Sequence, residues 1–285
     1  MTVNRKIVAL MFDSHCGWRG GLMPPDVQLL DDTGPEPRTW TPVQTSIQRW
    51  TWPLHVEALD SIFALAGKSD VVLVQGGDLT QGNKHGEGAV STRLADQYAI
   101  ALAVLEPWYQ RRNLKRVFLT EGTEVHEWGE GSAPVMIGAE LSRRYPKVQT
   151  RVAKHWLLDV GGTPIDIAHH GPGQSKRIWL HNDELRRYAR NILITEALAG
   201  RETPQVIARG HVHQGIEPER VRIPGHVCEA VVCPSVCGMS PYAQKVTQSQ
   251  YILTCGLTAA EIVNGEVLKV HTFWQELDLR TREAV

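Results

Sequence analysis

The sequence has no long apolar run and no excess of charge of one sign. Its first apolar stretch, Ile7 to Phe12, has six residues, which is too short for a membrane span or for the core of a signal peptide. Lysine and arginine number 30 against 31 aspartate and glutamate, so the totals show no strongly basic face for gripping long nucleic acid. We therefore expect a cytoplasmic protein that does not bind membranes.

Cysteine is also scarce, and five residues in a chain of 285 do not make a disulfide framework. Cys228, Cys233 and Cys237 lie close together, but they lack the C-x-x-C pairs that structural zinc sites prefer. They fall in or beside the apolar stretch Val227 to Val236, so we interpret them as buried thiols in a strand region. Histidine is more plentiful, with twelve residues, several of them in tight groups.

Strand-like and helix-like segments alternate along the chain. Short runs rich in valine, isoleucine and leucine, typical of strands buried on both faces, occur at Lys6–Phe12, Asp70–Gln75, Leu114–Thr120, Pro164–Ala168 and Pro204–Ala208. Helical periodicity predicts helices at Pro53–Ala66, Ser91–Arg112, Ala133–Tyr145 and Asn182–Ala199. Asn264-Gly265 indicates a hairpin between strands at Tyr251–Val263 and Glu266–Trp274. This order predicts a single layered α/β domain over residues 1–285.

The helix Asn182–Ala199 carries the clearest pattern. Asn182 is a suitable cap, and one face of the helix forms an apolar stripe of Leu185, Tyr188, Ala189, Ile192 and Leu193. Arg186, Arg187 and Arg190 lie between these positions. We interpret the arginines as a solvated face, with phosphate binding as the less favoured alternative.

The segment at about 17–53 interrupts this alternation. It is rich in proline, aspartate, threonine and tryptophan, a composition that argues against regular structure. Loops of this length inside a domain are usually lids or binding loops, or else disordered. Trp18 and Trp40 lie in this segment, and Trp128 follows a later strand. Their side chains either stack on a base of the substrate or pack the loops, and the sequence favours neither.

Carboxylates and imidazoles follow five of the predicted strands. The five groups are Asp13-Ser-His15, Gly76-Gly-Asp78, Gly122-Thr-Glu-Val-His126, His169-His170-Gly171 and Gly210-His-Val-His213. A single histidine after a strand is more often structural than a ligand. However, ligands of open α/β sheets bind beyond the carboxyl ends of the strands, so five such groups together predict one site.

The residue types in these groups are those of a transition-metal site. Mixed carboxylate and imidazole ligands favour Mn²⁺, Fe or Zn²⁺ over Ca²⁺, which takes oxygen alone. The Asp-x-His and His-x-His spacings place two ligands on one side of an extended segment. A carboxylate such as Asp78 can bridge two ions about 3.5–4 Å apart, as in phosphatases and nucleases. Ser14 has no base of its own that would mark it as a nucleophile.

The ordered set of motifs resembles the calcineurin-like metallophosphoesterase family. The pattern of that family is D-x-H, G-D, G-N-H-[DE], a later H and then G-H-x-H, each after a strand. Matching segments run from Asp13 to His213, about seventy per cent of the chain. Each motif is short, but their common order is specific. The resemblance implies a four-layer α/β/β/α sandwich, with two mixed sheets flanked by helices.

The resemblance also implies roles for individual residues. One metal ion would be bound by Asp13, His15, Asp78 and His213. The other would be bound by Asp78, His170, His211 and a ligand from the third motif. His170 is preferred to His169 because it directly precedes the glycine, as in the family. His126 would protonate the leaving group. The implied cofactors are two divalent ions, with manganese favoured over iron, zinc and nickel.

The third motif departs from the family pattern. The asparagine that ligates the second ion is missing, and two residues are added before the histidine. Thr123 stands after the glycine, and Glu124 is the alternative oxygen donor. A Gly-Thr-x-x-His version resembles phage-encoded members of the family, which suggests a phage or prophage origin and the host cytoplasm as location.

The predicted function is hydrolysis of phosphodiesters, nucleotidic ones among them, by a metal-activated hydroxide. The expected partner is a phosphate-ester substrate, with nucleotides and nucleic acids among the candidates. A phosphomonoesterase is the close alternative, because the same site serves both reactions. A nuclease acting on DNA or RNA is disfavoured by the neutral charge. A non-catalytic scaffold is disfavoured further, because such proteins lack the histidines that this sequence retains.

Overall fold

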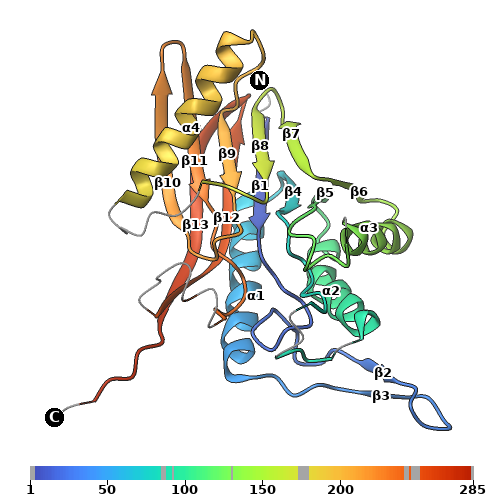
Figure 1. The fold of residues 1–285 in the computed structure, drawn as a ribbon. Coiled ribbons are helices and arrows are strands. Elements are labelled where there is room, and N and C mark those ends of the chain that lie inside the picture. The colour runs from blue at the N-terminus through green and yellow to red at the C-terminus, as the bar shows by residue number, and fades with distance from the viewer. Residues whose placement is uncertain are drawn as a thin grey trace.

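Two β-sheets pack face to face and carry helices on their outer sides (Figure 1). The computed structural model describes residues 4–84, 88–91, 93–129, 131–172, 180–240, 244 and 251–283. The larger sheet has the strand order β13 (Glu266–Asp278), β12 (Ile252–Val263), β1 (Arg5–Met11), β4 (Asp70–Gln75), β5 (Leu114–Thr120) and β6 (Gln149–Ala153). The smaller sheet has the order β10 (Ile216–Ile223), β11 (His226–Val232), β9 (Val206–Arg209), β8 (Pro164–Ala168) and β7 (His155–Asp159).

Parallel pairing aligns the strand ends that matter for function. In the larger sheet β1, β4, β5 and β6 are parallel neighbours, and β12 and β13 add an antiparallel hairpin at one side. In the smaller sheet β8, β9 and β11 are parallel neighbours. The carboxyl ends of β1, β4 and β5 therefore share one edge of their sheet, as do those of β8 and β9.

Three apolar layers separate the four structural layers. Along β1, alternate side chains face opposite ways: Ile7 and Met11 belong to the core under the helices, whereas Val8 and Phe12 belong to the core between the sheets. The first of these cores packs against α1 (Ser46–Ala66), α2 (Leu94–Tyr109) and α3 (Ser132–Arg144). A third core lies between the smaller sheet and α4 (His181–Leu198). The predicted α/β/β/α sandwich is confirmed.

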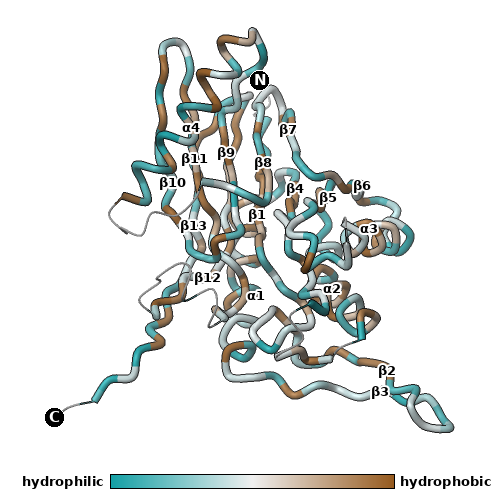
Figure 2. Tube along the Cα trace, viewed as in Figure 1, coloured by the Kyte–Doolittle hydropathy of each residue, from teal (hydrophilic) through white to brown (hydrophobic). Residues whose placement is uncertain are grey.

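The colouring by hydropathy agrees with this layering (Figure 2). Hydrophobic colour concentrates on the central strands, and α4 alternates between hydrophobic and hydrophilic colour along its length. The predicted apolar stripe of α4 is confirmed, with Leu185, Ala189 and Leu193 buried. Arg187 and Arg190 are exposed, as expected of a solvated face. No helix in the described part of the chain is long and apolar enough to cross a membrane.

The start of α1 differs from the prediction. The sequence predicted a helix that starts at Pro53, but α1 begins at Ser46 and continues through Pro53. Thr45 and Gln48 form a capping box, in which each side chain bonds to the backbone N–H of the other, and this fixes the earlier start. The segment predicted as an irregular loop also contains the short hairpin of β2 (Leu29–Asp31) and β3 (Arg38–Trp40), which projects from the body of the molecule (Figure 1).

Other elements were missed or placed differently. The strands β6 and β10 had no prediction, because part-exposed and charged residues interrupt their apolar pattern. Strand β11 lies in the strand region expected around Val227 to Val236. In α4 the residue at the cap is Leu180, and the side chain of Asn182 donates instead to Glu219. The predicted hairpin at Asn264-Gly265 is confirmed, with both residues at positive φ. All five cysteines are free and buried, in agreement with their interpretation as buried thiols.

The first prediction concerns His55 on α1. This side chain is buried between Trp52 and Trp108, and neither ring nitrogen has a hydrogen-bond partner. Burial lowers its pKa to about 4. As pH falls from about 6.5 to about 4, the unfolded chain gains a proton here that the folded chain does not. We expect His55 to lower the free energy of unfolding by about 3 kcal/mol over this range.

His55→Leu keeps a similar volume and removes the titrating group. Urea unfolding at pH 7 and pH 4.5 is expected to show a smaller loss of stability for this variant than for the wild type. His226→Gln, in β11 and outside this core, serves as the control. Equal losses in His55→Leu and the wild type would contradict the assignment.

Candidate metal centre

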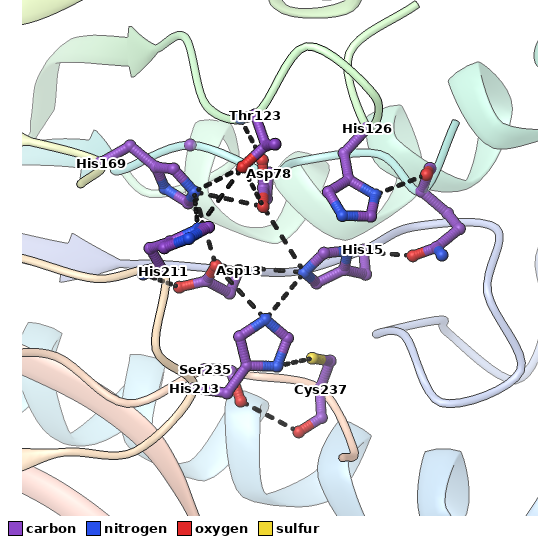
Figure 3. A network of polar contacts seen from close by, with 12 residues as sticks. Asp13, His15, Asp78, Thr123, His126, His169, His211, His213, Ser235 and Cys237 are labelled. Atoms are coloured by element: carbon purple, nitrogen blue, oxygen red, sulfur yellow. Dashed lines mark hydrogen bonds and ion pairs between the residues drawn. The ribbon is translucent and has the colours of Figure 1, made fainter. Parts of the chain in front are cut away.

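The five predicted groups meet where the strand ends of the two sheets face each other (Figure 3). Residues that follow β1, β4 and β5 come from the larger sheet, and residues that follow β8 and β9 come from the smaller one. The short bridge between Phe12 and Ser235 joins the end of β1 to the segment that follows β11. The structure thereby brings to one place side chains that are up to two hundred residues apart in the sequence.

A first group of donors surrounds the gap between two imidazoles. The Nε2 atoms of His15 and His213 are 3.1 Å apart. Asp13 Oδ1 lies 3.6 Å from His213 Nε2 and 4.0 Å from His15 Nε2. Asp78 Oδ2 lies 3.9 Å from the same His15 nitrogen. Two imidazole nitrogens and two carboxylates thus point at a common space.

A second group shares Asp78 with the first. Asp78 Oδ2 lies 3.1 Å from His169 Nε2, which in turn lies 3.1 Å from His211 Nδ1. Thr123 Oγ1 is 3.4 Å from each of these two nitrogens and donates to Asp78 Oδ2 at 3.2 Å. Asp13 Oδ1 also approaches His169 Nε2, at 3.9 Å. The two groups are therefore adjacent, and Asp78 faces both.

The structure brings His169 to this site beside His170, the residue that the sequence had favoured, and the ligand atoms of His169, His170 and His211 lie within 4.8 Å of one another. His169 is buried against Asp78, whereas His170 is exposed. The reason is the two-residue period of a strand: Ile165 and Ile167 face the core between the sheets, and His169 continues that face. His170 is exposed beyond the end of β8, and its ring centroid lies 4.9 Å from that of His169 and 4.4 Å from that of His211.

The third motif supplies Thr123 and not Glu124 to this cluster. Beyond its hydroxyl contacts, Thr123 donates its backbone N–H to Asp78 Oδ1 at 2.6 Å. Glu124 is exposed and borders a neighbouring cavity. Among the described residues, no group of potential metal ligands includes Glu124.

Backbone strain is concentrated at this site. Eight described residues other than glycine have positive φ, and five belong to the cluster: Asp13, His15, Asp78, His211 and His213. Such conformations cost about 1–3 kcal/mol each and persist where the surroundings impose them, often at functional sites. Close packing adds a further constraint, because a Cβ on Gly122 would lie 2.3 Å from Asp78 Oδ1.

Three histidines are held so that their Nε2 atoms face the cluster. His15 Nδ1–H donates to Gln81 Oε1 at 2.9 Å, and His169 Nδ1–H donates to the backbone oxygen of Gly76 at 2.9 Å. His213 Nδ1 lies 3.6 Å from the thiol sulfur of Cys237. Bonds of this kind fix the tautomer and the orientation of ligand histidines. Neither Gln81 nor Cys237 belongs to a motif, so no sequence signal indicated their contacts with the histidines.

The electrostatics of the cluster suit a cation. Asp13 Oδ1 is buried and has no hydrogen-bond partner. Burial raises the pKa of Asp13, and the charge of Asp78 raises it further. Burial also lowers the pKa of His211 and of His213 to about 4, which keeps both imidazoles in the neutral form that ligates metals. The donor set therefore fits a divalent ion, and the buried histidine and aspartate groups can hold a metal ion.

His126 lies at the border of this cluster. Its ring is perpendicular to that of His15, with centroids 4.6 Å apart. Its Nδ1–H donates to the backbone oxygen of Gln81 at 2.7 Å. The expected acid–base residue is therefore half-buried and fixed in orientation.

The three loop tryptophans have different environments. The ring of Trp18 lies 6.4 Å from that of His15, measured between centroids. Trp128 packs against the core under the helices. Trp40 is exposed on β3. Of the three, Trp18 is therefore next to the site, whereas Trp128 contributes to packing.

Sequence comparisons add no family to this picture. No model of a known protein family matches the chain, and no curated protein is significantly similar to it. The arrangement of the side chains is thus the basis on which a function can be assigned.

The second prediction concerns Asp13. The pKa of Asp13 is raised to about 7 in the folded protein. The metal-free fold therefore loses stability as pH rises from the range of an ordinary aspartate to about 7, and the whole loss is present at pH 8. Asp13→Asn is expected to raise the free energy of unfolding at pH 8 in the presence of chelator. In saturating Mn²⁺ the order should reverse, since the wild type gains stability from the bound ion and the variant loses a ligand.

Urea unfolding with and without metal measures both effects. Asp26→Asn, at an exposed position, is the control for the loss of one negative charge. The assignment of Asp13 would be contradicted if Asp13→Asn were less stable than the wild type in chelator. It would also be contradicted if Mn²⁺ raised the free energy of unfolding of the variant as much as that of the wild type.

Proposed function

We propose that this protein is a phosphoesterase of the calcineurin-like type, which uses two divalent metal ions to hydrolyse phosphodiesters. The observation that carries the proposal is the pair of adjacent donor groups that share Asp78, with His126 beside them. A structural metal site needs one closed set of ligands. Two adjoining sets with a fixed acid–base residue are instead the arrangement of binuclear hydrolytic centres.

The proposed ligands follow the two groups. Asp13, His15, Asp78 and His213 would hold one ion. Asp78, His169, His211 and Thr123 would hold the other. Two divalent ions, of which we favour Mn²⁺, would neutralise the phosphate oxygens and make hydroxide available near neutral pH.

The chain itself positions the reacting groups. Thr123 holds the carboxylate of Asp78 through its N–H and its hydroxyl, so this carboxylate keeps one orientation toward both donor groups. Gln81 supports the site twice, through Oε1 to His15 and through its backbone oxygen to His126. The second bond aligns the ring of His126, whose Nε2 would give its proton to the leaving oxygen of the ester.

The third prediction tests the function itself. In Mn²⁺, we expect the protein to hydrolyse bis-p-nitrophenyl phosphate faster than p-nitrophenyl phosphate, and to lose both activities in chelator. Asp78→Asn should lower the rate most, by about 10³-fold, because this carboxylate is the one residue proposed as a ligand of both ions. Asp26→Asn is the control for charge.

Steady-state rates with both esters, together with the metal content of each variant, decide the outcome. Full activity of Asp78→Asn or of metal-free protein would overturn the two-ion proposal. A faster monoester reaction would keep the metal centre and change the assignment to a phosphomonoesterase.

The fourth prediction concerns His126. His126→Ala should keep both metal ions and lose about 10²–10⁴-fold in rate, the usual contribution of general acid–base catalysis. The loss should be larger for phenyl than for p-nitrophenyl esters, because a poorer leaving group depends more on protonation. If the variant instead loses a metal ion, His126 is a ligand and its role as the acid is wrong.

A further inference from the structure

A cavity of about 370 Å³ borders the metal centre on the side of His169 and His170. Its lining also includes Tyr188 of α4, Lys154 between β6 and β7, and His155 at the start of β7. Cavities that bind small organic molecules measure about 300–1,000 Å³. The space is therefore large enough for an organic group attached to a phosphate at the metal centre.

The lining of this cavity includes a hydrogen-bond donor, the hydroxyl group of Tyr188. Arg209 is buried, and its Nε donates to the hydroxyl oxygen of Tyr188 at 2.9 Å. The other guanidinium nitrogens are held by the carboxylate of Asp166 at 2.6 Å and by the backbone oxygens of Asp166 and Ala208. Because the oxygen of Tyr188 accepts from Arg209, its O–H proton can be donated to a group bound in the cavity, which the side chain of Tyr188 lines.

The lining of the cavity also offers acceptors. Glu121 and Glu124, at the start of the segment that follows β5, both border the cavity. Lys154 lies 3.9 Å from Glu121, and His155 is bonded to Asp166 at 2.8 Å. Lys154 and His155 thus each have a carboxylate partner, and Glu124 adds a negative charge. Such a lining repels a second phosphate and suits a neutral group with hydroxyl or amino donors.

Rings also border this space. The side chains of His155, His170 and Tyr188 contribute planar surfaces, on which a nucleobase can stack. The cavity thus combines planar surfaces, one hydrogen-bond donor and two carboxylate acceptors. In a nucleoside the base can stack on the planar surfaces, a carbonyl or ring nitrogen can accept from the donor, and the sugar hydroxyls can donate to the carboxylates.

We infer that this cavity binds the nucleoside part of a small phosphodiester, so that the substrate is a nucleotide ester and not a nucleic acid polymer. The inference rests on the proposed function for the placement of the phosphate. Tyr188 is then a residue that determines specificity, since its hydroxyl contacts the nucleoside and Arg209 orients that hydroxyl.

Two esters with the same leaving group separate this contribution from the chemistry. Thymidine 5′-(p-nitrophenyl phosphate) carries a nucleoside, and methyl p-nitrophenyl phosphate does not. In Mn²⁺ the ratio of their kcat/KM values should exceed about 10, the gain expected from one stacked base. Tyr188→Phe should lower this ratio by about 3- to 10-fold, chiefly through KM, as the loss of one hydrogen bond predicts.

A binding measurement that needs no metal accompanies the kinetics. Calorimetric titration of chelator-treated protein with thymidine should show binding, weakened about 3- to 10-fold in Tyr188→Phe. Tyr145→Phe is the matched control, because its hydroxyl is bonded to Glu106 outside the cavity.

The outcomes distinguish the two proposals. A ratio near 1, no binding of thymidine, or equal effects of Tyr188→Phe and Tyr145→Phe would overturn the nucleoside site while leaving the phosphoesterase proposal intact. Binding of thymidine that depends on Tyr188, without hydrolysis of either ester, would support the nucleoside site and overturn the proposed function.

Discussion

The burial of two neighbouring carboxylates is the constraint on which this site depends. Asp13 and Asp78 are both within a few per cent of complete burial, and each disfavours the charge of the other. Burial of an unpaired charge is costly, so proteins pair it, neutralise it or bind a cation. Here the neighbours are imidazoles, and burial lowers the pKa of His15, His211 and His213. Without a metal ion, protons must supply the missing positive charge. Burial lowers the pKa of His169, but the negative charges of Asp78 and Asp13 and the hydrogen bonds of the ring together raise it by more, so His169 is the residue that accepts a proton.

The fold imposes this arrangement in spite of its cost. Parallel strands end at the same edge, and both sheets direct such edges to one place. Five residues of the cluster then adopt positive φ, which only a well-packed surrounding can enforce. Gly77 and Gly122 leave the room for this packing, since a Cβ on either would collide with His169 or Asp78. The rigid layers below the site thus stabilise a local structure that is unfavourable by itself.

Part of this arrangement could be predicted from the sequence. Strands buried on both faces have uninterrupted apolar runs, so β4, β5 and β8 were located with the correct ends, and the residues that follow them were expected to meet. The burial of His169 was also predictable, because it continues the alternation of Ile165 and Ile167; the family motif instead favoured His170, which lies beside the same site. Contacts between residues that are far apart in the sequence were not predictable where no motif marks them. Gln81 and Cys237 reach their histidines from loops without any motif, and the bond from Arg209 to Tyr188 joins a strand end to a helix by tertiary packing alone.

Diffraction from crystals grown with Mn²⁺, recorded at a wavelength where manganese scatters anomalously, tests the binuclear centre most directly. Two anomalous peaks are expected about 3.5–4 Å apart, one among Asp13, His15, Asp78 and His213 and the other among Asp78, Thr123, His169 and His211. A single peak, or a peak held by His169, His170 and His211 without Asp78, would contradict a binuclear centre built around the shared carboxylate.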